Sequence, residues 1–341
     1  MKAAIFRGGD IVVDDIAEPK PAAGQVLVRT LACGICGSDL HAAKHAPHMV
    51  EMSRRVAGRI PMDLSRDIVF GHEFCCEVLD YGPGTDRRLK AGARAVSMPI
   101  MPTGETRATV GYSNDYPGGY AERMVLAAPL LLEVPNGLPS EHAALTEPLA
   151  VGIHAVEKAA LAADDVPLVI GCGPVGLAAI VGLRLKGVHP IIAADFSPKR
   201  RELAGLMGAD IVIDPAKEAP YGHLPVGKRA VIFECVGVPG LIQQIFEAAP
   251  RDARIVVAGV CMEPDRIEPF FGIVKELSLQ FVLGYTPEEF ARCLRLLAEG
   301  KVDAEALVTG KVGLGGVKGA FEELANPERH TKIMVEPWRL S

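Results

Sequence analysis

Two patterns of apolar and polar residues follow one another along the chain. From residue 1 to about 130, short apolar runs such as QVLVRTLACG and GARAVSMPI are separated by Gly and Pro, which predicts many short β-strands. Beyond residue 140, the segment from Glu141 to Ala160 is alanine-rich and helical, and strands and helices then alternate regularly. The strand segments VPLVIG, HPIIAAD and RAVIFECVG are largely apolar, as in a parallel sheet covered by helices on both faces. The pattern predicts an α/β protein in which a β-rich domain precedes a doubly wound parallel sheet.

The end of the chain contains a helix segment and then a short strand segment like those of the first 130 residues. EEFARCLRLLAEG has the periodicity of an amphipathic helix, and TKIMVEP is a strand segment of the N-terminal type. A chain of 341 residues also exceeds what one hydrophobic core usually organises. We therefore expect residues 1–150 and 291–341 to form the β-rich domain and residues 151–290 to form the parallel-sheet domain.

Composition and charge narrow the classes of partner. Charged residues make up 23% of the chain, the net charge is −6, and there is no basic tract, which argues against a nucleic-acid partner. The most apolar stretch, Val175 to Leu185, is interrupted by Gly176, Gly182 and Arg184, so it fits a buried helix better than a membrane span. The eight cysteines, together with an N-terminus unlike a secretory signal, favour a cytoplasmic protein with reduced thiols.

A glycine-rich loop directly follows the strand VPLVI and opens a helix, the context in which a G-x-G-x-x-G pattern indicates dinucleotide binding. Its first glycine permits a tight turn, its second lets the backbone approach a pyrophosphate, and its third lets helix and strand pack closely. The phosphates then face the N-terminus of the helix. A tight strand-to-helix turn without a ligand is the structural alternative. The loop residues expected at the cofactor are Gly171, Gly173, Pro174, Val175 and Gly176.

An acidic residue at the end of the next strand bears on the choice of cofactor. Asp195 lies nineteen positions after Gly176, close to the spacing of a carboxylate that hydrogen-bonds the ribose of NAD. A carboxylate there would repel the 2′-phosphate of NADP. Arg200, with Lys199 and Arg201 beside it, could instead bind that phosphate. We expect NAD, with Arg200 near the cofactor, and keep NADP as the alternative.

A cysteine and a histidine in glycine-flanked segments are candidate metal ligands. Cys36 lies in CGICGSDLH and His72 in FGHEF, and a thiolate with an imidazole suits Zn²⁺. Taken singly, a cysteine such as Cys36 is more often a buried thiol, and a histidine such as His72 is more often a hydrogen-bonded loop residue. A catalytic zinc site also needs a third protein ligand and an open position. The residue types leave these candidates for the third ligand: Glu73, Glu147, Cys33, Cys75 and Cys76.

Five motifs occur in an order that resembles a known superfamily. GICGSDLH, GHEF, GGYAER, TEPLA and VIGCGPVG together resemble the zinc-dependent medium-chain dehydrogenases/reductases, and most of all their sorbitol, threonine and butanediol dehydrogenase branch. The resemblance runs from MKAAIF to TKIMVEP. It implies a GroES-like catalytic domain, a Rossmann domain, and hydride transfer between NAD(H) and a secondary alcohol or polyol, or the matching ketone. It also implies a homodimer or homotetramer, in which ARIVVAGV and LSLQFVLGY could extend the sheet across a two-fold axis.

The resemblance assigns roles to residues of the metal site. Cys36, His72 and Glu147 match the ligands of the catalytic zinc. Glu73 matches a glutamate that approaches the metal when its inner ligands exchange. In this assignment the zinc acts as a Lewis acid on the alcohol oxygen.

Three further residues match groups around the metal. Ser38 matches the hydroxyl that hydrogen-bonds the substrate alcohol, and Asp39 matches a partner of the metal ligands. His41 matches the far end of a proton relay through the cofactor ribose, where an unperturbed pKa of about 6.5 suits proton transfer. A solvated turn histidine is the plainer alternative for His41.

Two departures from the family pattern matter. Four closely spaced cysteines that bind a structural zinc in the family are missing from VSMPIMPTGETRATVGYSNDYPGGY, so we expect one catalytic zinc and no structural zinc. The stretch between Cys36 and His72 is also longer than usual, with HAPHMVEMSRRVAGRIPMDLSRD as an insertion that could form a lid or an interface. His45 and His48 within the insertion are most simply solvated side chains.

Two other functions are compatible with the sequence. Relatives on this scaffold include zinc-independent NAD(P)H reductases of enones or quinones, in which Cys36, His72 and Glu147 would have no role. A nucleotide-binding protein without enzymatic activity is the other alternative. The identity of the alcohol stays open, because pocket residues lie on loops that the sequence does not place.

Overall fold

The chain folds into two units in the computed structural model, which describes residues 1–56, 62–104, 106–135 and 137–340. Each unit has its own hydrophobic core. Unit 1 comprises Met1–Glu147, Phe290–Asn326 and Lys332–Ser341, and unit 2 comprises Pro148–Glu289 and Pro327–Thr331.

Unit 1 is built on a seven-stranded sheet around the long strand β3 (Gln25–Gly34). Buried and partly buried residues alternate along most of β3, as in a strand with one face on a core. Strand β3 pairs antiparallel with β4 (Glu73–Tyr81) and with β17 (Lys332–Val335), which comes from the other end of the chain. The remaining strands of this sheet are β5 (Arg94–Ser97), β8 (Arg123–Ala127), β9 (Leu131–Glu133) and β16 (Val308–Val312).

Two hairpins and several short helices complete unit 1. The hairpin of β6 (Ile100–Thr103) and β7 (Thr106–Thr109) occupies the segment in which the family pattern would have four cysteines. The other hairpin pairs β1 (Lys2–Arg7) with β2 (Asp10–Asp15). Its helices include α1 (Gly37–Lys44), α2 (Ala46–Arg54), α3 (Ser140–Ala144), α10 (Ala304–Leu307) and α11 (Val317–Leu324).

The first 130 residues contain helices that the strand pattern does not predict. Helix α2 lies in the insertion after Cys36, of which residues 57–61 are outside the described part of the chain. The expected helix from Glu141 to Ala160 is two helices, because α3 ends before Leu145 and α4 (Thr146–Lys158) begins after it.

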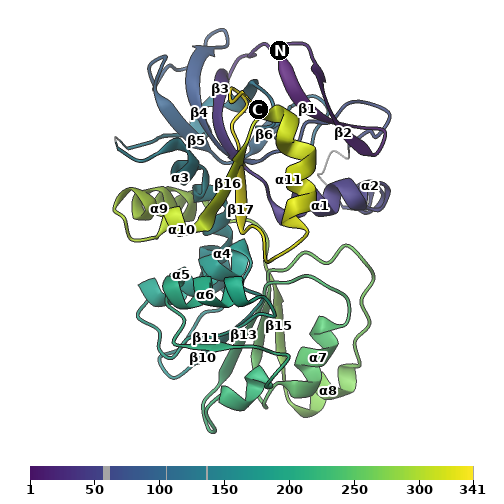
Figure 1. The fold of residues 1–341 in the computed structure, drawn as a ribbon, viewed down its shortest axis with the longest axis vertical. Helices are drawn as coiled ribbons and strands as arrows, with labels where there is room; N and C mark the ends of the chain where they lie inside the picture. The colour runs from purple at the N-terminus through teal and green to yellow at the C-terminus, as the bar shows by residue number, and fades with distance from the viewer. Residues whose placement is uncertain (57–61, 105, 136, 341) are drawn as a thin grey trace. The chain divides into compact units, whose positions relative to one another are not determined.

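Unit 2 is a six-stranded parallel sheet with helices on both faces (Figure 1). The strand order β12-β11-β10-β13-β14-β15 is the doubly wound order, in which the direction of winding reverses between β10 and β13. Helices α5 and α6 lie on one side of the sheet, and α7 and α8 lie on the other. The central strands are almost fully buried because both faces are covered, and the predicted α/β class is confirmed.

The strands of unit 2 are β10 (Val166–Ile170), β11 (Ile192–Ala194), β12 (Ile211–Ile213), β13 (Ala230–Glu234), β14 (Arg254–Val257) and β15 (Ser278–Phe281). Its helices are α5 (Pro174–Leu185), α6 (Pro198–Met207), α7 (Leu241–Ala248) and α8 (Pro269–Val274). The chain passes from unit 1 to unit 2 within α4 and returns to unit 1 near the start of α9 (Pro287–Ala298). Across the described residues, no helix has the length and apolar character needed to span a membrane.

Candidate metal centre and cofactor site

The pairing of β3 with β4 brings the two glycine-flanked segments together. Gly34, at the end of β3, faces Glu73 at the start of β4. Cys36 follows shortly after β3, and His72 directly precedes β4, so both residues lie at the same end of the sheet. Gly34 must lack a side chain, because a Cβ atom there would lie 2.1 Å from Oε2 of Glu73. Strand register, rather than closeness in sequence, therefore brings Cys36 near His72.

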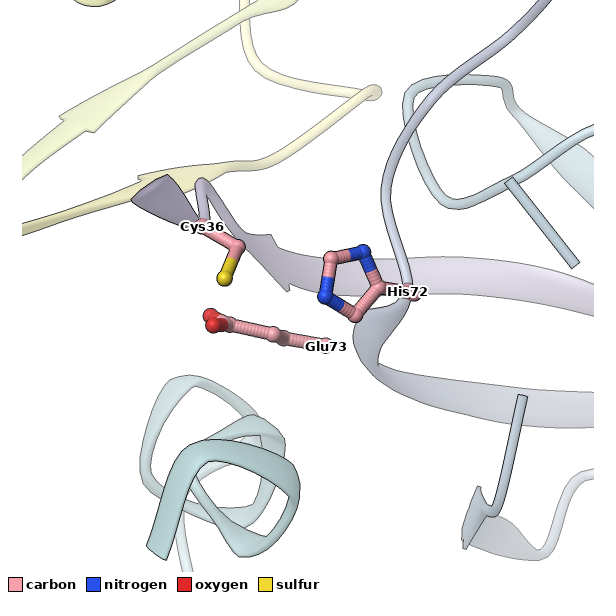
Figure 2. Close-up of side chains that lie close together, drawn as sticks. All are labelled: Cys36, His72 and Glu73. Atoms are coloured by element: carbon pink, nitrogen blue, oxygen red, sulfur yellow. The ribbon is translucent and has the colours of Figure 1, made fainter. Parts of the chain in front are cut away.

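Cys36, His72 and Glu73 form a group of potential metal ligands (Figure 2). Their sulfur, ring nitrogen and carboxylate oxygen all lie within 4.8 Å of one another. Glu73 is fully buried and His72 is 7% exposed, whereas Cys36 is partly exposed. A thiolate, an imidazole and a carboxylate are the donor types of catalytic zinc sites. The donor chemistry fits a zinc ion, and within the described parts of the chain no other group of three such residues is found.

The buried carboxylate of Asp39, on α1, supports His72. Its Oδ1 lies 3.3 Å from Nδ1 of His72, an ion-pair contact rather than a well-aligned hydrogen bond. Burial alone would lower the pKa of His72, but the charge of Asp39 raises it well above its ordinary value. Asp39 also accepts hydrogen bonds from the hydroxyls of Tyr112 and Tyr120 and from the N–H of Cys36. These contacts orient the ring, whose other nitrogen faces Cys36 (Figure 2).

Glu73 has a buried counter-ion. The Nζ of Lys332, on β17, lies 2.8 and 2.6 Å from the two carboxylate oxygens and donates to the carbonyl oxygen of Ile35 at 3.0 Å. Burial alone would lower the pKa of Lys332, but the carboxylate of Glu73 raises it. Lys332 therefore stays charged and neutralises Glu73. Sequence analysis did not identify Lys332, because no local pattern connects β17 with β4.

The structure places the two candidate glutamates differently. The family resemblance predicts Glu147 as the direct ligand and Glu73 as the reserve ligand, yet the group within 4.8 Å contains Glu73 and not Glu147. Glu147 lies in the first turn of α4, is 8% exposed, and also raises the pKa of Lys332. Burial raises the pKa of each remaining candidate thiol, and none of these cysteines belongs to the group around Cys36 and His72. They are Cys33, Cys75 and Cys76.

Ser38 and His41 lie one turn apart on α1. The Oγ of Ser38 is 2.9 Å from the hydroxyl of Tyr112. The ring of His41 stacks on that of His45, with centroids 6.4 Å apart. Burial lowers the pKa of His41, and the nearby charges of His45 and Lys44 lower it further. His41 is therefore neutral at pH 7 and has a ring nitrogen able to accept a proton.

The glycine loop lies in unit 2 at the carboxyl end of β10, where the strand order reverses. Gly171 has a φ of +90°, and a Cβ atom at Gly176 would lie 1.8 Å from the carbonyl oxygen of Gly171. A Cβ atom at Gly173 would meet no heavy atom closer than 3.9 Å, so the loop is open on that side. Helix α5 begins with Pro174 and Val175, and its N-terminal N–H groups can bind an anion.

Asp195 follows β11 and contacts the backbone of the same loop. Its Oδ2 accepts a hydrogen bond from the N–H of Cys172 at 2.7 Å, and its Oδ1 accepts one from the N–H of Ser197 at 2.8 Å. The guanidinium of Arg200 lies 4.0 Å from Oδ2, while Arg201 donates to the carbonyl oxygen of Asp195 at 2.8 Å. The structure thus brings Asp195 and Arg200 together beside the glycine loop.

A cavity at the carboxyl ends of β13 and β14 adds a residue that sequence analysis missed. The carboxylate of Glu234 accepts hydrogen bonds from the N–H groups of Val236 and Gly237, and burial raises its pKa. Ligands of doubly wound sheets bind at the carboxyl ends of the strands. In the sequence, Glu234 could have been identified as an acidic residue at the end of the apolar strand RAVIFE. The cavity is lined by Glu234, Gly237, Val257, Val260, Cys261 and Phe281, among others.

Two family models match the chain. Residues 22–136 match the alcohol dehydrogenase GroES-like domain, and residues 174–299 match the zinc-binding dehydrogenase family. The (R,R)-butanediol dehydrogenase of Bacillus subtilis is 32% identical over 360 residues, which cover 99% of this chain and 100% of the relative. The crystal structure of the Bacillus subtilis 2R,3R-butanediol dehydrogenase superposes with a TM-score of 0.81 at 31% identity, over 98% of this chain and 99% of that one. The chain belongs to the zinc-type medium-chain dehydrogenases.

Two further members of this family are similar over most of their length. The sorbitol dehydrogenase of Gallus gallus is 27% identical, with 98% of this chain and 96% of the relative covered. The L-threonine 3-dehydrogenase of Pyrococcus horikoshii is 30% identical, with 94% and 93% covered. This zinc-type medium-chain dehydrogenase is an enzyme that acts on CH–OH donors with zinc and a nicotinamide cofactor. The predicted family, fold class and enzyme class are confirmed.

Proposed function

We propose that this dehydrogenase oxidises a secondary alcohol whose neighbouring carbon carries a second oxygen or nitrogen, with reduction of NAD, and reduces the matching ketone in reverse. The main support is the group of Cys36, His72 and Glu73, whose donor chemistry fits a catalytic zinc. The names of the relatives support the substrate class. Butanediol with hydroxyls at carbons 2 and 3, sorbitol, and threonine oxidised at carbon 3 all carry a secondary hydroxyl beside another heteroatom.

Residues of unit 1 would prepare the alcohol. The three ligand side chains would hold the zinc, which when bound supplies a Lewis acid that lowers the pKa of the alcohol. Asp39 keeps the ring of His72 in its orientation. Ser38 accepts the hydrogen bond of the substrate hydroxyl. His41, whose lowered pKa keeps it neutral, receives the proton at the end of the relay.

Residues of unit 2 would bind NAD. The open side of the glycine loop and the N-terminus of α5 suit the pyrophosphate. The carboxylate beside the loop supports NAD over NADP, because it would repel a 2′-phosphate. We assign residues 151–290 to NAD binding and residues 1–150 with 291–341 to catalysis. The residues proposed at the cofactor are Gly171, Gly173, Pro174, Val175, Gly176, Asp195 and Arg200.

The distances and the family resemblance support different third ligands. We propose that Glu73, which lies in the group with Cys36 and His72, binds the zinc, and that Glu147 replaces it when the ligands exchange. One zinc per chain is expected, since the β6–β7 hairpin carries no cysteine. The zinc content of Glu73→Gln and Glu147→Gln tests the assignment. A greater loss in Glu147→Gln would reverse the order of the two glutamates.

Unit 2 has an apolar surface beside its edge strand β15, which we propose is covered by a second copy of the chain. Phe281 on β15 and Leu283 just after it are exposed, as are Phe270 and Ile273 on α8, the helix that precedes β15 in the chain, and exposed apolar side chains of this kind are typical of an interface. Pairing of two β15 strands across a two-fold axis would cover these side chains. Sedimentation velocity should detect a dimer or tetramer, and Phe281→Lys should dissociate it. A wild-type monomer would refute the proposal.

The activity is tested by NADH absorbance with secondary alcohols, vicinal diols, sugar alcohols and β-hydroxy amino acids. We expect turnover of substrates with a neighbouring heteroatom, abolished by a chelator and restored by zinc. Cys36→Ser should lose both zinc and turnover but keep its affinity for NADH. Turnover by the zinc-free variant would refute the zinc mechanism, and a preference for simple mono-alcohols would refute the substrate class.

A further inference from the structure

Tyr112 contacts two groups of the metal site at once. Its hydroxyl lies 2.9 Å from Oγ of Ser38 and 2.7 Å from Oδ1 of Asp39. Its ring packs against Phe70 and His72, with centroid distances of 5.7 and 5.3 Å, which holds the hydroxyl in place. Tyr112 follows strand β7, in the segment that lacks the cysteines of the family pattern.

The directions of these hydrogen bonds follow from the available protons. The carboxylate of Asp39 receives donors from Tyr112, Tyr120 and the N–H of Cys36, so it acts as an acceptor. Tyr112 has a single O–H, which it donates to Asp39. Its hydroxyl oxygen can then only accept from Ser38, so the proton of Ser38 points toward Tyr112.

We propose that Tyr112 is a positioning residue that makes Ser38 a hydrogen-bond acceptor toward the substrate. With its own proton directed at Tyr112, Ser38 presents lone pairs on its accessible side. A substrate alcohol can donate to these lone pairs, whereas a ketone oxygen can only accept. The site is therefore set to bind the alcohol more tightly than the ketone. This inference rests on the proposed role of Ser38 in substrate binding.

Tyr112→Phe tests the proposal, because it removes the hydroxyl and keeps the ring. Ser38 then loses the partner that directs its proton and can turn that proton toward the substrate. We expect KM for the alcohol to rise about 3- to 10-fold, the range for one hydrogen bond, with little change in kcat for oxidation. The equilibrium constant links the two directions through their kcat/KM values, so kcat/KM for ketone reduction should fall by the same factor if cofactor binding is unchanged.

Tyr120→Phe is the matched control. Tyr120 donates to Oδ2 of Asp39 at 2.7 Å, the same length as the bond from Tyr112 to Oδ1. Both variants therefore remove one hydroxyl donor from Asp39, but Tyr112→Phe also removes the contact with Ser38. A rise in the KM for the alcohol with little change in kcat for oxidation should appear in Tyr112→Phe and not in Tyr120→Phe.

A double-mutant cycle with Ser38→Ala completes the test. Tyr112→Phe should have no further effect on the alcohol KM once Ser38 is alanine. Additive effects, equal KM changes in the two tyrosine variants, or loss of zinc from Tyr112→Phe would each overturn the proposal. An unchanged alcohol KM in zinc-loaded Ser38→Ala would instead refute the proposed role of Ser38, so the two failures are distinguishable.

Discussion

The ion pair between Lys332 and Glu73 leads to a quantitative prediction for stability. The two residues are 1% and 0% exposed, and Nζ lies 2.6 Å from Oε2. At an effective dielectric constant of about 20, their attraction is about 6 kcal/mol. Lys332→Met keeps an unbranched side chain but leaves the carboxylate of Glu73 buried without its counter-ion. Removing one partner of a buried pair costs about 3–5 kcal/mol. The melting temperature of the zinc-free variant should fall by roughly 5 °C.

Thermal unfolding measures this effect in a double-mutant cycle of four zinc-free proteins, namely the wild type, Lys332→Met, Glu73→Gln and the double variant. Glu73→Gln removes the charge that Lys332→Met leaves uncompensated, so the double variant should recover most of the lost stability. Zinc would supply a replacement positive charge, so adding it should raise the melting temperature of Lys332→Met more than that of the wild type. The reasoning is refuted if Lys332→Met melts at the wild-type temperature or if Glu73→Gln does not restore its stability.

Three predictions concern the cofactor site. Gly176→Ala places a methyl group 1.8 Å from the carbonyl oxygen of Gly171, so it should cost about 1–3 kcal/mol in thermal unfolding; an unchanged melting temperature would contradict this. Gly173→Ala has space for its methyl group and should melt like the wild type but bind NADH more weakly by fluorescence titration. Asp195→Ala should raise the ratio of kcat/KM for NADP to that for NAD, and an unchanged ratio would argue against Asp195 as the selecting group.

Local patterns were sufficient for the architecture of unit 2. The apolar segments VPLVIG and RAVIFECVG are the central strands β10 and β13, and the glycine loop follows β10 as its spacing predicts. Asp195 also lies beside the loop, because one strand–helix–strand unit fixes its distance from Gly176. The break between α3 and α4 at Leu145 was missed, since alanine-rich composition favours helix throughout that segment.

The metal centre needed more than local patterns. Cys36 and His72 were recognisable from their residue types and flanking glycines. That Glu73, and not Glu147, lies in one group with them depends on the pairing of β3 with β4. Lys332 reaches Glu73 only because β17 pairs with β3, with Met334 opposite Gly34.

The sequence by itself therefore determined the order of the elements, the glycine loop with its acidic residue, and the residue types of the metal site. Tertiary structure decided which buried polar side chains meet: Lys332 with Glu73, and Tyr112 with Ser38 and Asp39. The physical reason is that periodicity specifies which face of an element is buried. Contacts between distant polar groups depend on strand register and on the paths of loops, which periodicity does not encode.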